Sequence, residues 1–184
     1  MKVFFQKTLN EVDISSRDLL VIDILYSTGI RVSECVSILV RDININKKTI
    51  KVLGKGNKER IVVFGDKTKI NIISYLNEIL NDRNDFFLFP AQIKKRQLKK
   101  KSITTRTIYN IVKKYIKLVS NNEKLGPHSL RHSFATHLMQ GGSDLMAIKD
   151  LLGHESLSST QIYTHLDIKK MKEIYDKSHP QAKK

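Results

Sequence analysis

Hydrophobic positions along the chain recur mainly at helical spacing, so the pattern predicts a domain made mostly of helices. Ser15 and Ser16 suit the N-cap of a first helix, and Gly29 suits its end. The expected helices cover approximately residues 17–28, 33–39, 67–80, 104–119, 127–140, 144–152 and 168–177, with a shorter one that starts near Ser158 or Ser159 and contains Tyr163. The helix over 144–152 is expected to bury Leu145, Ile148, Leu151 and Leu152.

Two short runs rich in β-branched residues, 49–53 and 60–64, interrupt the helical pattern. The turn-forming segment Gly54-Lys55-Gly56-Asn57-Lys58-Glu59 separates them, which predicts a β-hairpin with a basic tip. The expected fold class is therefore mainly α with a small antiparallel β-sheet (α+β), in a single domain over residues 1–184.

The charge of the chain indicates a polyanionic partner. Its 184 residues include 33 Lys and Arg against 18 Asp and Glu, a net charge of +15. Nucleic acid is the first candidate partner and an acidic membrane surface the second. A dense basic run, which either contacts phosphates or is a solvated loop, consists of Lys94, Lys95, Arg96, Lys99, Lys100 and Lys101.

Composition excludes several classes of protein. The chain has one cysteine, Cys35, so neither an intramolecular disulfide nor a metal site of several thiolates can form. Its densest apolar run, residues 19–26, contains Asp23 and is much shorter than the ~20 residues of a membrane span. We therefore expect a cytoplasmic protein. The histidines lack the close spacing of a zinc motif and the glycines lack Walker spacing, so we expect no metal and no cofactor.

Two pairs of residues have a spacing that suits phosphate chemistry. His128 and Arg131 are neighbours on a helix, which places a proton-transfer group beside a fixed cation. Arg31 follows a helix end, three residues before Glu34, whose carboxylate can orient the guanidinium. Each pair alone is better explained by structure, as a helix cap, a carbonyl contact or a junction ion pair.

Three further residues stand at exposed or terminal positions. Lys55 lies at the hairpin tip between two glycines, and His154 follows a helix end. Tyr163 can act as a nucleophile where cations favour its phenolate. Taken singly, a turn lysine is more often solvated and a helical tyrosine more often packed.

Taken together and in order, these segments resemble the catalytic domain of tyrosine recombinases, the phage-integrase family, and most of all its Xer branch, which resolves bacterial chromosome dimers. The similarity covers nearly the whole chain through TGIRVSE, GKGNKER, HSLRHSFATHL, LLGHESLSSTQIYTH and the closing HPQ.

The resemblance implies a role for each matching residue. Arg31 and Arg131 would clamp the scissile phosphate, and Glu34 would support them. Lys55 would protonate the leaving 5′ oxygen. His128 would assist proton transfer at the tyrosine, and His154 would hydrogen-bond a phosphate oxygen. Tyr163 would attack, giving a 3′-phosphotyrosyl link without metal or ATP.

The resemblance also implies partners. Double-stranded DNA with a specific recombination site would be the substrate, and the helix from Thr104 is the candidate for the major groove. The terminal helix around Ile174 either joins protomers into a homo- or hetero-tetramer on DNA or packs on its own domain. The expected DNA contacts are Arg60, Arg106 and the run formed by Lys94, Lys95, Arg96, Lys99, Lys100 and Lys101.

One departure concerns the front of the chain. Family members usually carry an N-terminal domain that holds the other side of the DNA, and we expect that domain to be absent here. The chain would then be a natural short form, a truncated product or a fragment. The alternatives to a recombinase are a non-catalytic DNA-binding regulator that retains the fold and a topoisomerase-like relaxing enzyme. A basic adhesion module is least favoured, because it needs no such set of residues.

Overall fold

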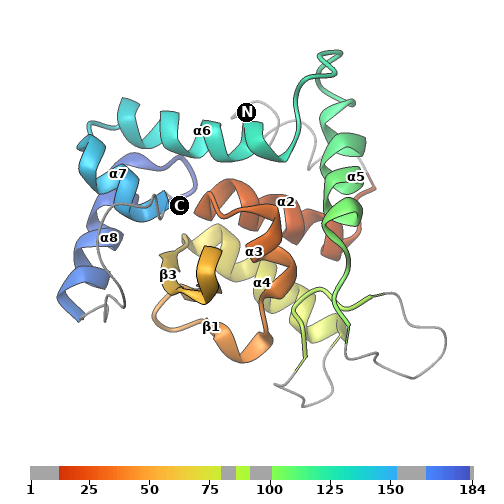
Figure 1. Ribbon diagram of the computed structural model, residues 1–184, viewed down its shortest axis with the longest axis horizontal. Coiled ribbons are helices and arrows are strands. Elements are labelled where there is room, and N and C mark those ends of the chain that lie inside the picture. The colour runs from red at the N-terminus through yellow and green to blue at the C-terminus, as the bar shows by residue number, and fades with distance from the viewer. Residues whose placement is uncertain (1–12, 80–85, 92–100, 153–164, 183–184) are drawn as a thin grey trace.

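The computed structural model describes residues 13–79, 86–91, 101–152 and 165–182 (Figure 1). It confirms a mainly helical fold with one small antiparallel sheet. The helices are α2 (Ser16–Thr28), α3 (Val32–Ser37), α4 (Asp66–Ile79), α5 (Thr105–Ile116), α6 (Pro127–Gln140), α7 (Leu145–Leu152) and α8 (His165–Ser178). The strands are β1 (Ile43–Asn44), β2 (Thr49–Leu53) and β3 (Glu59–Val63), with 3₁₀ turns at Val40–Asp42 and Lys55–Asn57.

Helix α2 is the centre of the fold. It contacts α3, α4, α5 and α6, which surround it in Figure 1. Its sequence is apolar on every side rather than on one stripe, as expected for a helix enclosed by others. The Ser15 side chain accepts a hydrogen bond from the backbone N–H of Asp18 at its start. Gly29 ends it with φ +62°, a left-handed conformation that favours glycine.

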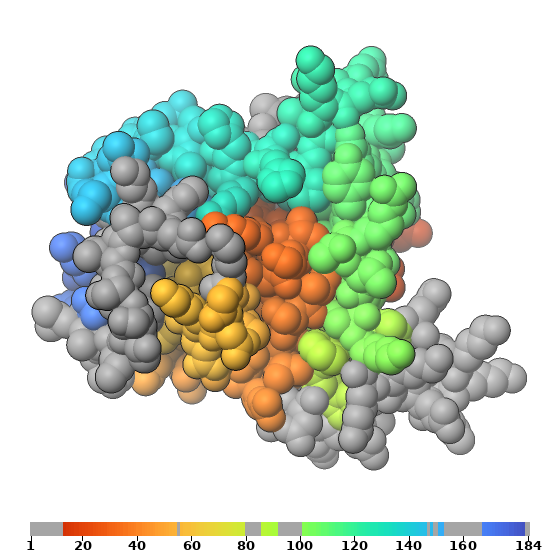
Figure 2. Space-filling view, in the orientation of Figure 1, coloured from red at the N-terminus to blue at the C-terminus, as the bar shows by residue number. Residues whose placement is uncertain are grey.

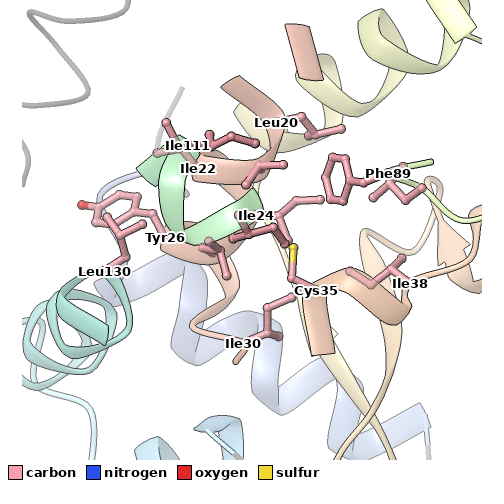
Figure 3. Close-up of a cluster of buried hydrophobic side chains, with 14 of the residues drawn as sticks. Leu20, Ile22, Ile24, Tyr26, Ile30, Cys35, Ile38, Phe89, Ile111 and Leu130 are labelled. Atoms are coloured by element: carbon pink, nitrogen blue, oxygen red, sulfur yellow. The ribbon is translucent and has the colours of Figure 1, made fainter. Parts of the chain in front are cut away.

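Two apolar clusters hold the elements together. The larger surrounds α2, and Figure 3 shows Leu20, Ile22 and Ile24 among side chains from the α3 region, α5 and the segment that carries Phe89. The smaller joins α6, α7 and α8 through residues such as Phe134, Leu138 and Tyr175. Each fully buried side chain of this size contributes about 1.5–3 kcal/mol. Helix α6, which contacts α2, connects the smaller cluster with the central helix.

The sheet has the order β1-β2-β3 with antiparallel neighbours. In the predicted hairpin, Thr49 pairs with Val63 and Leu53 with Glu59, so residues 54–58 form the turn. Ile50 and Val52 face inward on β2, whereas Lys51 and Leu53 are exposed. The two-residue strand β1 was not predicted, because a strand this short shows no alternation of apolar and polar residues.

Most predicted helix boundaries lie within a few residues of the observed ones, and α6 matches at both ends. Leu145 is an exception, since the prediction that it is buried is wrong: it is 56% exposed, whereas Ile148, Leu151 and Leu152 are buried. It is the first residue of α7, whereas the three buried residues lie in the later part of the helix. The helix expected near Ser158 lies outside the described residues. Within the described ranges no helix is long and apolar enough to span a membrane.

Candidate active site

The junction between α2 and α3 places Arg31 beside Glu34. Gly29 turns the chain, and Arg31 then adopts the extended conformation of an N-cap before α3. The Glu34 carboxylate, at the third position of α3, accepts the backbone N–H of Arg31 at 2.6 Å and its Nη1 at 3.2 Å. The Arg31 side chain is 40% exposed. Its guanidinium is therefore anchored to Glu34 yet accessible to a ligand.

Arg60 approaches the same carboxylate from β3. Its Nη1 donates to Glu34 Oε1 and its Nη2 to Oε2 at 3.0 Å, which is a bidentate pair. The Arg60 side chain is only 8% exposed. The sequence predicts a DNA contact for Arg60, whereas the structure places its guanidinium on Glu34.

Arg131 connects three elements. From α6 its Nη1 donates to the carbonyl oxygen of Gly29, at the end of α2, and its Nη2 donates to that of Leu152, at the end of α7, at 2.8 Å. Burial lowers the pKa of Arg131 to about 10, and the nearby charges of Arg31 and Arg60 contribute to this decrease, against the effect of Glu34. The side chain remains charged at neutral pH. Gly29, whose carbonyl it binds, lies two residues before Arg31, so Arg131 reaches the same junction at which Glu34 holds Arg31 and Arg60.

His128 lies one turn before Arg131 in the first turn of α6. Pro127 occupies the first helical position, where a missing N–H is tolerated, and the N–H of Gly126 donates to Ser129 Oγ at 3.2 Å. These contacts define where the helix begins. His128 itself is exposed and therefore open to a ligand that approaches Arg131.

The hairpin turn that carries Lys55 begins next to the Glu34–Arg60 pair. The N–H of Gly54 donates to the carbonyl oxygen of Lys58 at 2.8 Å, which closes the turn. A Cβ at Gly54 would lie 3.6 Å from Glu34 Oε1 and 3.8 Å from Arg60 Nη1. The backbone of Lys55 thus begins next to the cluster that holds Arg31.

Several predicted site residues fall outside the described residues, namely His154, Tyr163, Lys94, Lys95, Arg96, Lys99 and Lys100. Two of them are close in sequence to described residues. Leu152, whose carbonyl is bound by Arg131, lies two residues before His154. Tyr163 lies two residues before the start of α8. Lys101 is exposed, and Arg106 is exposed on α5 with its guanidinium 5.9 Å from the ring of Tyr109.

The cluster combines three guanidinium groups with one carboxylate, so it carries an excess of positive charge. Fixed cations of this kind stabilise a phosphate that gains negative charge during a reaction. On the face shown in Figure 2 the α3 region lies below α6 and beside α5, and the hairpin lies next to the α3 region on the side away from α5. In the described ranges no group of three or more His, Cys, Asp or Glu could hold a metal ion.

The pairing of Arg60 with Glu34 was missed in the sequence, although a signal for it exists. Arg60 precedes Val62 by two residues, so both side chains lie on the same, inward face of β3. An arginine at an inward position needs an anionic partner, because isolated charges are rarely buried. Glu34 is the partner that the fold supplies.

Comparison with known proteins identifies relatives along almost the whole chain. Residues 5–170 match the model of the phage integrase family. The tyrosine recombinase XerC of Thermodesulfovibrio yellowstonii is 46% identical over 171 residues, which cover 91% of this chain and 56% of that protein. The XerC of Histophilus somni is 42% identical over 172 residues, which cover 93% of this chain and 56% of that protein. The chain thus spans about half the length of these curated relatives.

Solved structures show the same fold. An integrase from mycobacterium phage Brujita superposes with a TM-score of 0.76 at 22% identity, over 97% of this chain and 56% of that chain. The XerA recombinase gives 0.69 at 28% identity, over 97% and 63%. A pre-cleavage complex of the XerH site-specific recombinase with its difH substrate gives 0.67 at 27% identity, over 94% and 47%.

Proposed function

The chain belongs to the phage integrase family, and from this membership we propose that it is the catalytic domain of a site-specific tyrosine recombinase. The observation that carries the proposal is the cluster of Arg31, Arg131 and Glu34. Two arginines from distant parts of the sequence meet at the α2–α3 junction, Arg31 held by the Glu34 carboxylate and Arg131 by the carbonyl of Gly29, and each is fixed by hydrogen bonds before any substrate arrives. Preorganised donors of this kind are what a phosphoryl transition state requires.

The proposed reaction is a pair of transesterifications. The Tyr163 hydroxyl oxygen attacks the scissile phosphorus, the bond from phosphorus to the 5′ oxygen breaks, and a 3′-phosphotyrosyl bond forms. His128 assists removal of the tyrosine proton, and Lys55 supplies a proton to the 5′ oxygen. Arg31, Arg131 and His154 bind the non-bridging oxygens. A 5′ hydroxyl of a second strand then attacks the phosphorus and releases Tyr163, so the bond energy is kept and ATP is not needed.

The proposed substrate is double-stranded DNA with a specific recombination site. Arg106 and Lys101 are exposed near α5, as expected for phosphate contacts. We propose a tetramer on DNA that uses surface of α8 in addition to its internal contacts. Met171 and Tyr175 of α8 are buried against their own domain, so a neighbouring protomer would bind other parts of this helix. Chromosome-dimer resolution and mobile-element integration are the two biological roles that fit, and a cytoplasmic location stays a prediction.

The test is covalent capture on nicked suicide DNA that bears candidate sites from the source genome. We expect a protein–DNA adduct on a denaturing gel that disappears in Tyr163→Phe. Tyr109→Phe is the matched control, because it removes the hydroxyl of a 40% exposed tyrosine outside the arginine cluster and keeps the ring that lies near Arg106, so this variant should still form the adduct. Binding without an adduct, also with a longer protein that includes the preceding domain of its relatives, would instead favour a non-catalytic DNA-binding role.

A further inference from the structure

Arg60 lies where an arginine is costly to place. Its side chain is 8% exposed, and its Nε, which is buried, has no hydrogen-bond partner within the described part of the chain. Burial of a charged side chain is destabilising unless the group is paired. The carboxylate with which it pairs is Glu34, through both Nη atoms. A buried pair of this kind adds little stability on its own, so its position beside Arg31 invites a functional explanation.

Glu34 is shared between two arginines. Its Oε1 accepts Nη1 of both Arg31 and Arg60, and its Oε2 accepts the backbone N–H of Arg31 and Nη2 of Arg60. Arg60 makes the bidentate contact from the buried side. Within the described residues Arg31 makes one side-chain hydrogen bond, at 3.2 Å, and its side chain is 40% exposed.

We propose that Arg60 is a positioning residue for Arg31, acting through Glu34. By neutralising the buried carboxylate, Arg60 lets Glu34 hold Arg31 at a single nitrogen instead of drawing in its whole guanidinium. Arg31 then presents free donors to the scissile phosphate. The inference rests on the proposed recombinase function and assigns to that site a residue that does not itself touch DNA.

The charges support this division. Burial alone would raise the pKa of the Glu34 carboxyl, but the hydrogen bonds and charge of Arg60, followed by Arg31, lower it below its ordinary value. The carboxylate is therefore ionised, and its largest opposing partner is Arg60. Without Arg60, one buried negative charge would face Arg31 as its nearest cation, and the attraction between them would strengthen.

Arg60 also connects Arg31 with the hairpin of Lys55. In the β2–β3 register Arg60 pairs with Val52, close to the turn. Gly54, the residue before Lys55, lies in van der Waals range of the Glu34–Arg60 pair. Removal of the Arg60 side chain therefore changes both the packing under Gly54, at the start of the turn, and the carboxylate that holds Arg31.

The test compares four variants. Arg60→Met removes the charge, Arg60→Lys keeps the charge but not the bidentate geometry, and the double variant Arg60→Met with Glu34→Gln removes both charges of the pair. Lys51→Met is the matched control, because Lys51 is an exposed lysine of the same hairpin that pairs with Glu59 and not with Glu34. Two measurements are made on each: the single-turnover cleavage rate at saturating DNA, and the Arg31 Nε–Hε signal in nitrogen-15 NMR of the DNA-free protein.

We expect Arg60→Met to shift the Arg31 signal and to slow cleavage by roughly 10–100-fold, the order expected from a small displacement of a reacting group. Arg60→Lys should give a smaller loss. The double variant should cleave about tenfold faster than Arg60→Met, because the neutral amide introduced by Glu34→Gln attracts the Arg31 guanidinium less than a carboxylate does. Lys51→Met should leave the rate and the Arg31 signal unchanged.

Two results would overturn the inference. One is an Arg31 Nε–Hε signal whose chemical shift is the same in Arg60→Met, in Arg60→Lys and in the wild type. The other is a rate loss that the double variant does not recover, which would assign Arg60 a structural role only. If neither the wild-type chain nor the longer protein with the preceding domain of its relatives forms a covalent adduct, while Arg60→Met still moves the Arg31 signal, the recombinase proposal fails and the positioning of Arg31 stands.

Discussion

Arg131 combines a structural and a chemical task in one guanidinium. It binds the carbonyl oxygens of Gly29 and Leu152, and in the proposed phosphate site its charge acts together with that of Arg31. A lysine cannot reproduce two such contacts, because its ammonium is a point charge without a planar fork. The two tasks can therefore be separated by comparing substitutions at this position.

We predict that Arg131→Ala slows cleavage by roughly 10²–10³-fold or more, the usual effect of removing one transition-state donor. It should also lower the free energy of unfolding by about 1–3 kcal/mol, because two carbonyl groups lose their donor. Single-turnover cleavage and urea unfolding measure the two effects. Arg131→Lys should recover part of the stability and little of the rate, and an Arg131→Ala variant that cleaves normally would contradict the role of this residue.

At this scale the sequence predicted the local parts of the site better than the distant ones. The spacing of Arg31 and Glu34 is three residues, so their contact follows from local geometry alone. The contact of Arg60 with Glu34 spans 26 residues and depends on which face of β3 points inward. The alternation of Arg60 with Val62 indicates that face, but only the fold shows that Glu34 is the partner on it.

Among the secondary-structure elements, α2 depends most on how it ends. Gly29 has φ +62°, and a Cβ there would lie 2.5 Å from Cδ1 of Phe134 on α6. The same residue offers its carbonyl to Arg131. Its backbone conformation, the packing of α6 and the position of a site arginine are thus connected at one residue.

We predict that Gly29→Ala lowers the free energy of unfolding by about 2–4 kcal/mol, from backbone strain together with the clash against Phe134. Gly142→Ala is the matched control, because Gly142 has φ +82° and a Cβ added there would meet no atom within 4 Å. It should cost only the backbone strain, about 1–2 kcal/mol. Equal losses in urea unfolding of the two variants would show that Phe134 does not press against Gly29.

The elements themselves were largely predictable where end signals and periodicity agree. Pro127 and Gly141 mark the ends of α6, and its predicted bounds match the observed ones. Leu145 has the spacing of the buried stripe of α7 and is nevertheless exposed, because burial depends on where the neighbouring helices end. Periodicity gives the face of a helix but not how far along that face another element reaches.

Across the whole molecule, the C-terminal tail closes the fold onto its central helix. Gln181 Nε2 donates to Asp23 Oδ1 on α2 at 2.6 Å, and the ring of His179 stacks on Tyr175 at 4.7 Å. The His179 ring also lies 5.2 Å from Tyr26 and 5.3 Å from Phe134. The last described residues therefore join α2, α6 and α8.

This arrangement makes stability depend on pH. Burial, and then the nearby His137, lowers the pKa of His179 to about 3. In the unfolded chain this histidine binds a proton at about pH 6.5, whereas in the folded protein it does so only at about pH 3. The stability that depends on a neutral His179 is therefore complete above about pH 6.5 and is lost as the pH falls toward about 3. We predict that the stability difference between wild type and His179→Asn shrinks by about 1.4 kcal/mol per pH unit below 6.5.

Urea unfolding at about pH 7 and about pH 5, on either side of the ordinary histidine pKa, measures that difference. His132→Asn, at an exposed position of α6, is the control and should follow the wild type at both pH values. A stability difference between wild type and His179→Asn that stays constant over this range would mean that His179 is not held neutral by its surroundings.

The net charge of +15 makes the proposed DNA binding sensitive to salt, and the fold indicates where the charges that matter lie. A protein that contacts six to ten phosphates loses roughly 10³–10⁵ in affinity between about 50 and 200 mM salt.

Arg106 is exposed on α5, at the opposite end of the molecule from α8 in Figure 1. Arg106→Met should therefore reduce the slope of log affinity against log salt by about one. Lys177→Met removes an equal charge from α8 and should leave the slope unchanged. Titrations of labelled DNA over this range measure all three slopes; equal reductions in both variants would mean that net charge, rather than the α5 surface, attracts the DNA.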